Sequence, residues 1–213
     1  MKLFTYFRSS ASYRVRIALN LKAIDHETAF VHLRKREQDH PDYVWLNPQR
    51  LVPTLVDGPH VLTQSLAMLE YLDETHPQPP MLPAEPAARA RVRSLAYLVA
   101  SDIHPLNNLR VLQFLSVEFG VTEEERTDWY RHWVALGFGA LERLLTAEAG
   151  TGRYCHGDQP TLADACLVPQ IHNAERFGCP MDAYPTIRRI NTECLAQPAF
   201  ADAAPNAQSD ADA

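Results

Sequence analysis

Short apolar runs in the first 76 residues alternate with segments whose apolar positions have helical spacing. Four runs have the length and the aromatic or branched content of strands: Lys2–Tyr6, Ala29–Leu33, Thr54–Val56 and His60–Leu62. The last two flank Asp57-Gly58, a pair typical of a tight hairpin turn. Helices are predicted from about Ser12 and from about Ser65 to His76-Pro77. This order predicts an α/β layer in which helices cover a mixed, four-stranded sheet.

The rest of the chain is predicted to be all-helical. Five prolines between Pro77 and Pro86 disfavour a helix or a central strand, so 77–86 is predicted to link a domain of residues 1–76 to one of residues 87–213. The predicted helices are Ala87–Leu115 with a kink at Pro105, one from Thr122–Thr127 to about Leu145, one after the capping box Thr161–Asp164, and Tyr184–Leu195. The polar, alanine-rich tail from Ala199 is expected to be disordered.

The composition is that of a globular protein, with 46% hydrophobic and 22% charged residues. A formal net charge of -6 argues against a basic footprint, so no nucleic-acid partner is expected. No apolar run reaches the ~18 residues that span a bilayer. Arg8 also interrupts the apolar stretch that a secretory signal would need. We therefore expect a cytoplasmic protein without a membrane partner.

The cysteines favour neither a disulfide scaffold nor a metal site. All four follow residue 154, and none forms a Cys-x-x-Cys pair: they are Cys155, Cys166, Cys179 and Cys194. The nine histidines are scattered without the spacing of a ligand set. We therefore expect no bound metal.

The first candidate site is Phe7–Arg16, which joins the first predicted strand to the first helix. Backbone N–H groups and the positive end of the helix dipole stabilise an anion at such a junction. Ser9, Ser10 and Ser12 add hydroxyl groups, and Arg8 adds a fixed positive charge. Simple N-capping by serine is an equally good interpretation of this stretch alone.

Two further junctions have ligand-binding features. Val52-Pro53 precedes a strand, so the peptide bond could be cis and Val52 could offer its backbone N–H and C=O to an extended peptide. The alternative is that Pro53 only begins an edge strand. Gln64-Ser65 begins the second helix, where Ser65 could cap the helix and the same end could hold a carboxylate.

Together these segments resemble the soluble glutathione transferases. Ser9-Ser10-Ala11-Ser12-Tyr13-Arg14-Val15-Arg16 is similar to the zeta-class signature S-S-C-x-W-R-V-R, and the segment from Asp102 to Arg110 resembles the matching part of that class. The resemblance covers about residues 1–200. It implies a glutathione transferase fold, with an α/β thioredoxin-like N-terminal domain and an all-α C-terminal domain that contributes the substrate site. It also implies a homodimer.

The resemblance implies a glutathione-dependent cis–trans isomerase of the maleylacetoacetate or maleylpyruvate type. The motif cysteine is Ala11 here and the tryptophan is Tyr13, so the reactive sulfur must come from glutathione. A thiol has an ordinary pKa of about 8.5. A helix N-terminus and nearby cations lower it. Ser9 and Ser10 would stabilise the thiolate, and Tyr6 is disfavoured for this role because it falls within the predicted strand.

The resemblance also implies a set of binding residues. Glutathione would contact Ser9, Ser10, Ala11, Gln38, Val52, Gln64, Ser65, His104 and Asn108. The substrate, a small dicarboxylate diketo acid, needs cations, and the candidates are Arg8, Arg110 and Arg176. For the last two a solvated helix face is an equal alternative. His104 could instead be a buried histidine at the kink, and Arg14 and Arg16 are expected to be structural or peripheral.

Three functions remain open at this point. The first is isomerisation of maleylacetoacetate to fumarylacetoacetate in tyrosine and aromatic breakdown, with maleylpyruvate of the gentisate pathway as the alternative substrate. The second is a transferase or dehalogenase that acts on small 2-halo acids. The third is a binding module without activity, which the intact Ser9-Ser10 and Gln64-Ser65 pairs disfavour.

Overall fold

The computed structural model describes residues 1–211 of the 213-residue chain. It separates into two units. The first contains Met1–Met81 together with the C-terminal segment that begins at Leu195, and the second contains Leu82–Cys194. The boundary between Met81 and Leu82 lies within the proline-rich segment.

The first unit contains the mixed four-stranded sheet that the sequence predicts. Its strands are β1 (Lys2–Thr5), β2 (Glu27–Phe30), β3 (Thr54–Asp57) and β4 (His60–Thr63), in the order β2-β1-β3-β4. β1 runs parallel to β2 and antiparallel to β3, which forms the predicted hairpin with β4. β2 begins two residues before the predicted Ala29 and ends at Phe30, before Leu33. Because this edge strand is largely exposed, apolar alternation marks it poorly.

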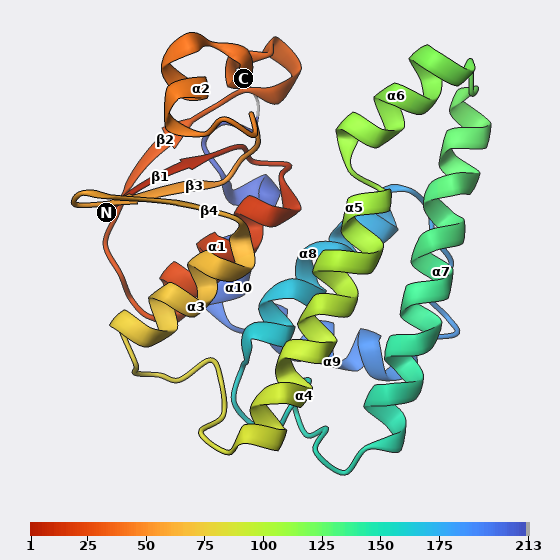
Figure 1. Cartoon of the computed structure of the whole chain (residues 1–213). Helices are drawn as coiled ribbons and strands as arrows, with labels where there is room; N and C mark the ends of the chain where they lie inside the picture. The colour runs from red at the N-terminus through yellow and green to blue at the C-terminus, as the bar shows by residue number, and fades with distance from the viewer. Residues whose placement is uncertain (212–213) are drawn as a thin grey trace. The chain divides into compact units, whose positions relative to one another are not determined.

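Helices α1 (Ser10–Leu21) and α3 (Ser65–Thr75) lie side by side against the sheet (Figure 1). The sequence did not predict α2 (Pro41–Leu46), which has proline at its first turn, or the short 3₁₀ turns η1 (Leu33–Lys35) and η2 (Glu37–Asp39). Lys22 at the end of α1 is buried and donates to Asp73 Oδ1 (2.8 Å) and to the carbonyl oxygen of Pro79 (2.9 Å). This buried cation holds the beginning of the proline-rich segment against the first unit.

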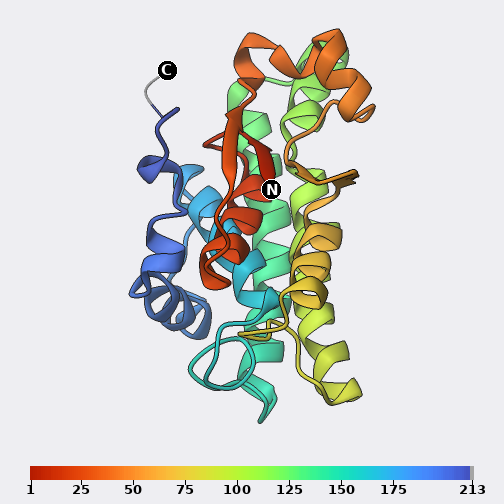
Figure 2. The same cartoon turned by 90° about the vertical axis from the view of Figure 1, so that its left-hand side faces the viewer.

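The C-terminal tail is folded through residue 211, which corrects the expectation of disorder from Ala199. It forms α10 (Pro198–Ala201) and the 3₁₀ turn η4 (Pro205–Ala207). Phe200 is fully buried, and its carbonyl oxygen accepts a hydrogen bond from the Tyr13 hydroxyl on α1 (3.1 Å). Figure 2 shows this segment in blue beside α1 in red. One aromatic side chain and specific backbone hydrogen bonds therefore order a stretch whose composition is typical of disorder.

The second unit is helical. Its long helices are α4 (Pro86–Tyr97), α6 (Leu109–Phe119), α7 (Glu123–Ala147), α8 (Leu162–Arg176) and α9 (Pro185–Leu195), and α4 and α7 run in opposite directions (Figure 1). The single helix predicted over Ala87–Leu115 is instead interrupted. α4 passes into a π-helical segment, η3 (Leu98–Ile103), and the short α5 (His104–Leu106) precedes a break at Asn107-Asn108. The break occurs because the Asn108 side chain caps a new helix by accepting from the Arg110 N–H.

The capping box at the start of α8 is confirmed. The Asp164 carboxylate is fully buried and accepts from the backbone N–H of Thr161 (2.8 Å) and of Cys155 (2.8 Å). The Thr161 hydroxyl also donates to it (2.8 Å). Asp164 therefore ties the loop before α8 to the helix that forms the core of the second unit.

Candidate functional site

Ser9 caps α1, at the junction that the sequence analysis singled out. Its Oγ accepts from the Ser12 N–H (3.1 Å), and its own N–H donates to the Tyr6 carbonyl oxygen (3.0 Å). Capping uses a lone pair of the hydroxyl oxygen, so the hydroxyl hydrogen remains available to an external acceptor. Ser9 is half-buried, whereas Ser10 has only 6% of its surface exposed. The capping and ligand-binding interpretations of this serine are therefore compatible.

The rest of the first turn of α1 offers a positive environment without a reactive side chain. The turn contains no acidic residue, and its first N–H groups point out of the helix end. Ala11 is half-buried and carries no functional group. Arg8 lies with its guanidinium 5.2 Å from the centroid of the Phe7 ring and makes no ion pair with residues 1–211. This junction can stabilise an anion through N–H groups, a hydroxyl and a guanidinium.

The start of α3 is a second helix N-terminus in the same unit. The cap is Gln64 rather than Ser65, which corrects the sequence prediction, and Ser65 is the first helical residue. Gln64 has a φ of 68°, which is uncommon for a residue other than glycine. Its Nε2 donates to Gln49 Oε1 (2.8 Å). Such a backbone outlier persists only where surrounding contacts hold it, and ligand-binding positions are enriched in them.

Arg14 connects these two helix ends. It is 2% exposed, and its Nη1 donates to Ser65 Oγ (3.2 Å). From the sequence this arginine is expected to be structural or peripheral, yet it contacts one of the predicted glutathione residues. No local sequence signal marks this arginine, because its burial depends on α3 packing against α1.

The Val52-Pro53 peptide bond is cis, which is one of the two alternatives left open by the sequence. Val52 is 7% exposed and packs in a cluster with Tyr6, Phe7, Val31 and Tyr43. The Tyr43 hydroxyl donates to the Leu51 carbonyl oxygen (2.6 Å). Asn47 Nδ2 donates to the same oxygen (2.8 Å). Asn47 and Tyr43 therefore fix the loop before β3, a role that no sequence motif indicates.

Gln38 lies in η2, and Tyr6 follows β1. The Gln38 Oε1 atom is buried without a hydrogen-bond partner among residues 1–211. An amide in this state is suited to accept from a ligand N–H. The Tyr6 ring is 4% exposed and packs against the rings of Phe7 and His32. Tyr6 is thus part of the apolar core beside the junction rather than its exposed surface.

The remaining candidates belong to the second unit. His104 begins α5, and its Nε2 lies 3.4 Å from Asn108 Nδ2. Arg110 is exposed in the first turn of α6, next to the capping Asn108. Arg176 is exposed at the end of α8, with its guanidinium 4.6 Å from the centroid of the Phe177 ring. The structure brings His104, Asn108 and Arg110 together on consecutive turns, while Arg176 lies on another helix.

The cysteines are unsuited to nucleophilic chemistry. All four are buried and reduced, and all lie in the second unit. Burial raises the pKa of the Cys155 thiol well above its ordinary value, and the nearby Asp164 carboxylate adds to the effect. Burial likewise raises the pKa of Cys179 and of Cys194. A thiolate would have to come from a ligand.

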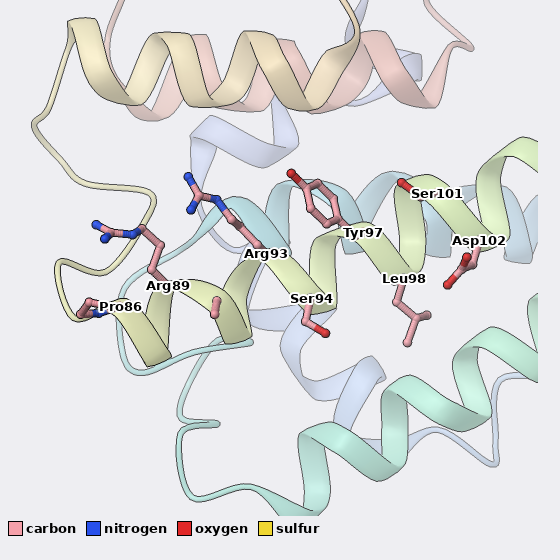
Figure 3. Close-up of a pocket in the computed structure, with 9 residues that line it drawn as sticks. Pro86, Arg89, Arg93, Ser94, Tyr97, Leu98, Ser101 and Asp102 are labelled. Carbon is pink, nitrogen blue, oxygen red and sulfur yellow. The ribbon is translucent and has the colours of Figure 1, made fainter.

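A hollow of about 710 Å³ lies along the exposed face of α4 and η3. It is lined by Arg89, Arg93, Tyr97 and Asp102, among others. Figure 3 shows Arg93, Tyr97 and Ser101 along one side of this face and Ser94, Leu98 and Asp102 along the other. Its lining includes none of the predicted site residues. The hollow is therefore a surface feature of the second unit, separate from the candidate residues above.

Comparisons with known proteins agree with the sequence resemblance. The family model for the glutathione S-transferase N-terminal domain matches residues 8–75. A probable maleylacetoacetate isomerase of Vibrio cholerae serotype O1 is 51% identical, over 98% of this chain and 97% of that protein. A holo maleylpyruvate isomerase structure, from a bacterial glutathione S-transferase of the zeta class, is 47% identical, with a TM-score of 0.97 and 99% coverage of both chains.

A second solved structure is a maleylacetoacetate isomerase from Methylobacterium extorquens with bound malonate and glutathione. It is 47% identical to this chain, covers 100% of both chains and has a TM-score of 0.97. Within residues 1–211, no helix is long and apolar enough to cross a membrane.

Proposed function

This chain belongs to the zeta-class glutathione transferases, in the group of the maleylacetoacetate and maleylpyruvate isomerases, and on that premise we propose that it is a glutathione-dependent cis–trans isomerase. The proposed reaction converts maleylacetoacetate to fumarylacetoacetate in the breakdown of tyrosine and other aromatic compounds. The observation that carries the proposal is Ser9, a half-buried helix cap whose hydroxyl hydrogen remains available at the positive end of α1.

The residues of the first unit fit glutathione by the chemistry of their donors and acceptors. The tripeptide carries two carboxylates, an ammonium group, amide N–H groups and a thiol. The N-termini of α1 and α3 suit its anionic groups, and the buried Gln38 Oε1 suits one of its N–H groups. When bound, glutathione would supply a thiolate that adds to one carbon of the cis double bond and so leaves a single bond that can rotate. Elimination of the thiolate would then re-form the double bond as the trans isomer.

Ser9 stabilises the negative charge of the sulfur in this proposal. Its hydroxyl donates toward the thiolate while its Oγ continues to cap α1. The N–H groups of the first turn and the Arg8 guanidinium add to the stabilisation. Ser10, which is nearly buried, contributes at the second position of the motif, and Ala11 leaves space beside the sulfur.

The second helix end holds the glutathione backbone. We assign one carboxylate to Gln64 and Ser65 at the start of α3, with the buried Arg14 beside them. Val52 in the cis-proline loop pairs with the extended tripeptide backbone. His104 and Asn108 of the second unit complete the proposed set, and their 3.4 Å approach makes them one polar group.

The substrate is dianionic, so it requires cations. Arg8, Arg110 and Arg176 are assigned to its carboxylates because each is at least partly accessible and guanidinium matches a carboxylate with two hydrogen bonds. Malonate, a small dicarboxylate, is bound in the solved relative from Methylobacterium extorquens. That ligand supports a dicarboxylate as the substrate class.

Maleylpyruvate is the second candidate substrate, because the zeta-class holo structure with a TM-score of 0.97 is a maleylpyruvate isomerase. Both substrates present a cis-enedione flanked by carboxylates, so the same residues would act on either. A dehalogenating or conjugating side activity on small 2-halo acids would use the same thiolate.

The test is a direct assay of the purified protein with each cis substrate, with and without glutathione. We expect glutathione-dependent loss of the cis-enedione and formation of the trans isomer, with maleylacetoacetate giving the higher kcat/KM. A higher value for maleylpyruvate would transfer the assignment to the second candidate. Turnover of neither substrate, or turnover that does not need glutathione, would reject the proposal.

A cytoplasmic homodimer forms part of the same proposal. Support for the dimer comes from the resemblance to the zeta-class family. Light scattering during gel filtration should give twice the 24.0 kDa mass of one chain. A mass of one chain at micromolar concentration would reject the dimer.

A further inference from the structure

The C-terminal segment reaches back to the loop that carries Ser9. Asp210 is 5% exposed, and its Oδ2 accepts a hydrogen bond from the Phe7 N–H (3.0 Å), across 203 positions of sequence. Phe7 precedes the capping serine by two positions. A carboxylate from the far end of the chain therefore contacts the backbone of the proposed catalytic loop.

Arg16 holds the same loop from the other side. Its Nη2 donates to the Phe7 carbonyl oxygen (3.1 Å) and its Nη1 to the Tyr6 carbonyl oxygen (3.4 Å). The Ser9 N–H donates to that same Tyr6 oxygen (3.0 Å). Asp210 thus accepts from the Phe7 N–H, and Arg16 donates to the Phe7 C=O. Two buried groups of opposite charge therefore fix the peptide units before and after Phe7.

The segment from 198 to 211, which we call the strap, is itself firmly attached to the first unit. Arg16 Nε donates to the Ala203 carbonyl oxygen (2.9 Å), and Asn20 Nδ2 donates to that of Ala199 (3.0 Å). Ala211 packs on the apolar cluster that contains Phe7 and Val52. Burial lowers the pKa of Arg16 to about 10, with Asp210 opposing the effect, so the guanidinium stays charged at neutral pH.

We propose that Asp210 is a positioning residue for Ser9, acting through Phe7. This inference rests on the proposed function. Bonds to charged groups are roughly twice as strong as bonds between neutral groups, and a buried one restricts its partner in orientation. By holding Phe7, the strap keeps the Ser9 hydroxyl aimed where the thiolate forms, so its loss affects turnover more than ligand affinity.

The experiment compares Asp210→Ala with the matched control Asp202→Ala, an exposed aspartate on the same strap. Asp210→Ala should lower kcat about 10-fold with a smaller change in the substrate KM, because misorientation by about 1 Å can cost up to 100-fold. It should also raise the pKa of bound glutathione, followed by the ultraviolet absorbance of the thiolate. Asp210→Asn, whose Oδ1 can still accept from Phe7 in a weaker, neutral bond, should be clearly less impaired than Asp210→Ala in both kcat and the pKa of bound glutathione. Asp202→Ala should leave both unchanged.

Several outcomes would overturn the inference. One is a folded Asp210→Ala protein with the wild-type kcat and the wild-type thiolate titration. Another is an Asp210→Asn variant as impaired as Asp210→Ala, since that would assign the effect to charge rather than to the hydrogen bond. If Asp210→Ala does not fold, Asp210→Ser, too short to reach Phe7, takes its place.

Failure of the proposed function is separable from failure of this inference. If the wild-type protein does not bind glutathione, amide hydrogen exchange still measures how firmly the strap holds residues 7–12. Faster exchange there in Asp210→Ala than in Asp202→Ala would support the positioning role, and equal exchange would overturn it.

Discussion

Arg14 of α1 donates a hydrogen bond to Ser65 at the start of α3, so a single buried guanidinium joins the N-terminal parts of these two helices. Both ends present N–H groups, and both are assigned to anionic groups of glutathione. A fixed cation between them keeps their spacing constant and reinforces their positive potential. Arg14 and Arg16 flank Val15 on α1 but have different roles. Arg14 joins α1 to α3, whereas Arg16 fixes the loop that precedes Ser9.

The first prediction concerns Ser9. Ser9→Ala removes the donor to the thiolate, so kcat at saturating glutathione should fall roughly 100-fold, the scale for loss of one preorganised anion donor. The melting temperature should also fall, because loss of a serine cap costs about 1 kcal/mol. Stopped-time product assays and thermal unfolding would measure the two effects separately.

Ser9→Thr is the matched control, since it keeps the hydroxyl group and the cap. It should retain much more activity than Ser9→Ala. If Ser9→Ala turned over at close to the wild-type rate, the thiolate donor would have to be Ser10, and wild-type rates in both alanine variants would remove the serines from the mechanism.

The second prediction is that no cysteine of the chain takes part in the reaction. Each is buried, and burial holds the pKa of Cys155, Cys179 and Cys194 above the ordinary value, which disfavours the nucleophilic thiolate. Replacement of each by serine or alanine should leave glutathione-dependent kcat within about 2-fold of wild type, apart from losses of stability of roughly 1–3 kcal/mol. One folded variant that binds glutathione but lacks activity would contradict this.

The sequence predicted the sheet, the hairpin, the serine junction and the α8 capping box because each has a local signal. Short runs of aromatic and branched residues mark the strands, Asp-Gly marks the turn, and Thr161 with Asp164 marks the cap. The interruption at Asn107-Asn108 was missed because an asparagine cap inside an apolar periodic stretch resembles a surface position.

The parts of the site that the sequence did not reveal depend on contacts between distant residues. Asp210 and Phe7 are 203 positions apart, and the polar composition around Asp210 is typical of a frayed end. Burial of Arg14 and Arg16 likewise depends on α3 and on the strap packing against α1, which no local pattern encodes. Hydrogen bonds between distant residues and buried charges follow no fixed sequence spacing, so only a structure reveals them.

The third prediction tests the folded tail. Phe200 is fully buried against the first unit, so Phe200→Ala should destabilise the protein by roughly 3–5 kcal/mol, the range for deletion of a buried aromatic side chain. Phe119→Ala is the control, because this phenylalanine is 70% exposed. Its replacement should change the free energy of unfolding by less than about 0.5 kcal/mol. Urea unfolding of both variants gives the comparison. Equal stabilities would mean that the tail contributes nothing to the fold.

The last prediction separates substrate binding from glutathione binding. Arg110 and Arg176 are exposed on α6 and α8, and the protein carries a net charge of -6, so local cations must attract a dianionic substrate against the overall charge. Screening over about 8 Å at physiological salt limits the effect of distant acidic groups. A charge-assisted hydrogen bond contributes roughly 1.5–3 kcal/mol. Arg110→Met or Arg176→Met should therefore lower kcat/KM for the substrate by about 10- to 150-fold, at about 1.4 kcal/mol per decade.

Glutathione affinity should change much less in these variants, because its carboxylates are assigned to the first unit, at Ser65 and the helix ends. Arg188→Met on α9 is the matched control, since Arg188 is also exposed, pairs with Asp182 (3.5 Å) and is not assigned to the substrate. Initial rates with each ligand varied at saturating concentrations of the other give both constants. Equal losses for both ligands, or a loss for neither, would remove Arg110 and Arg176 from the substrate site and leave Arg8 as the cation that receives the carboxylate.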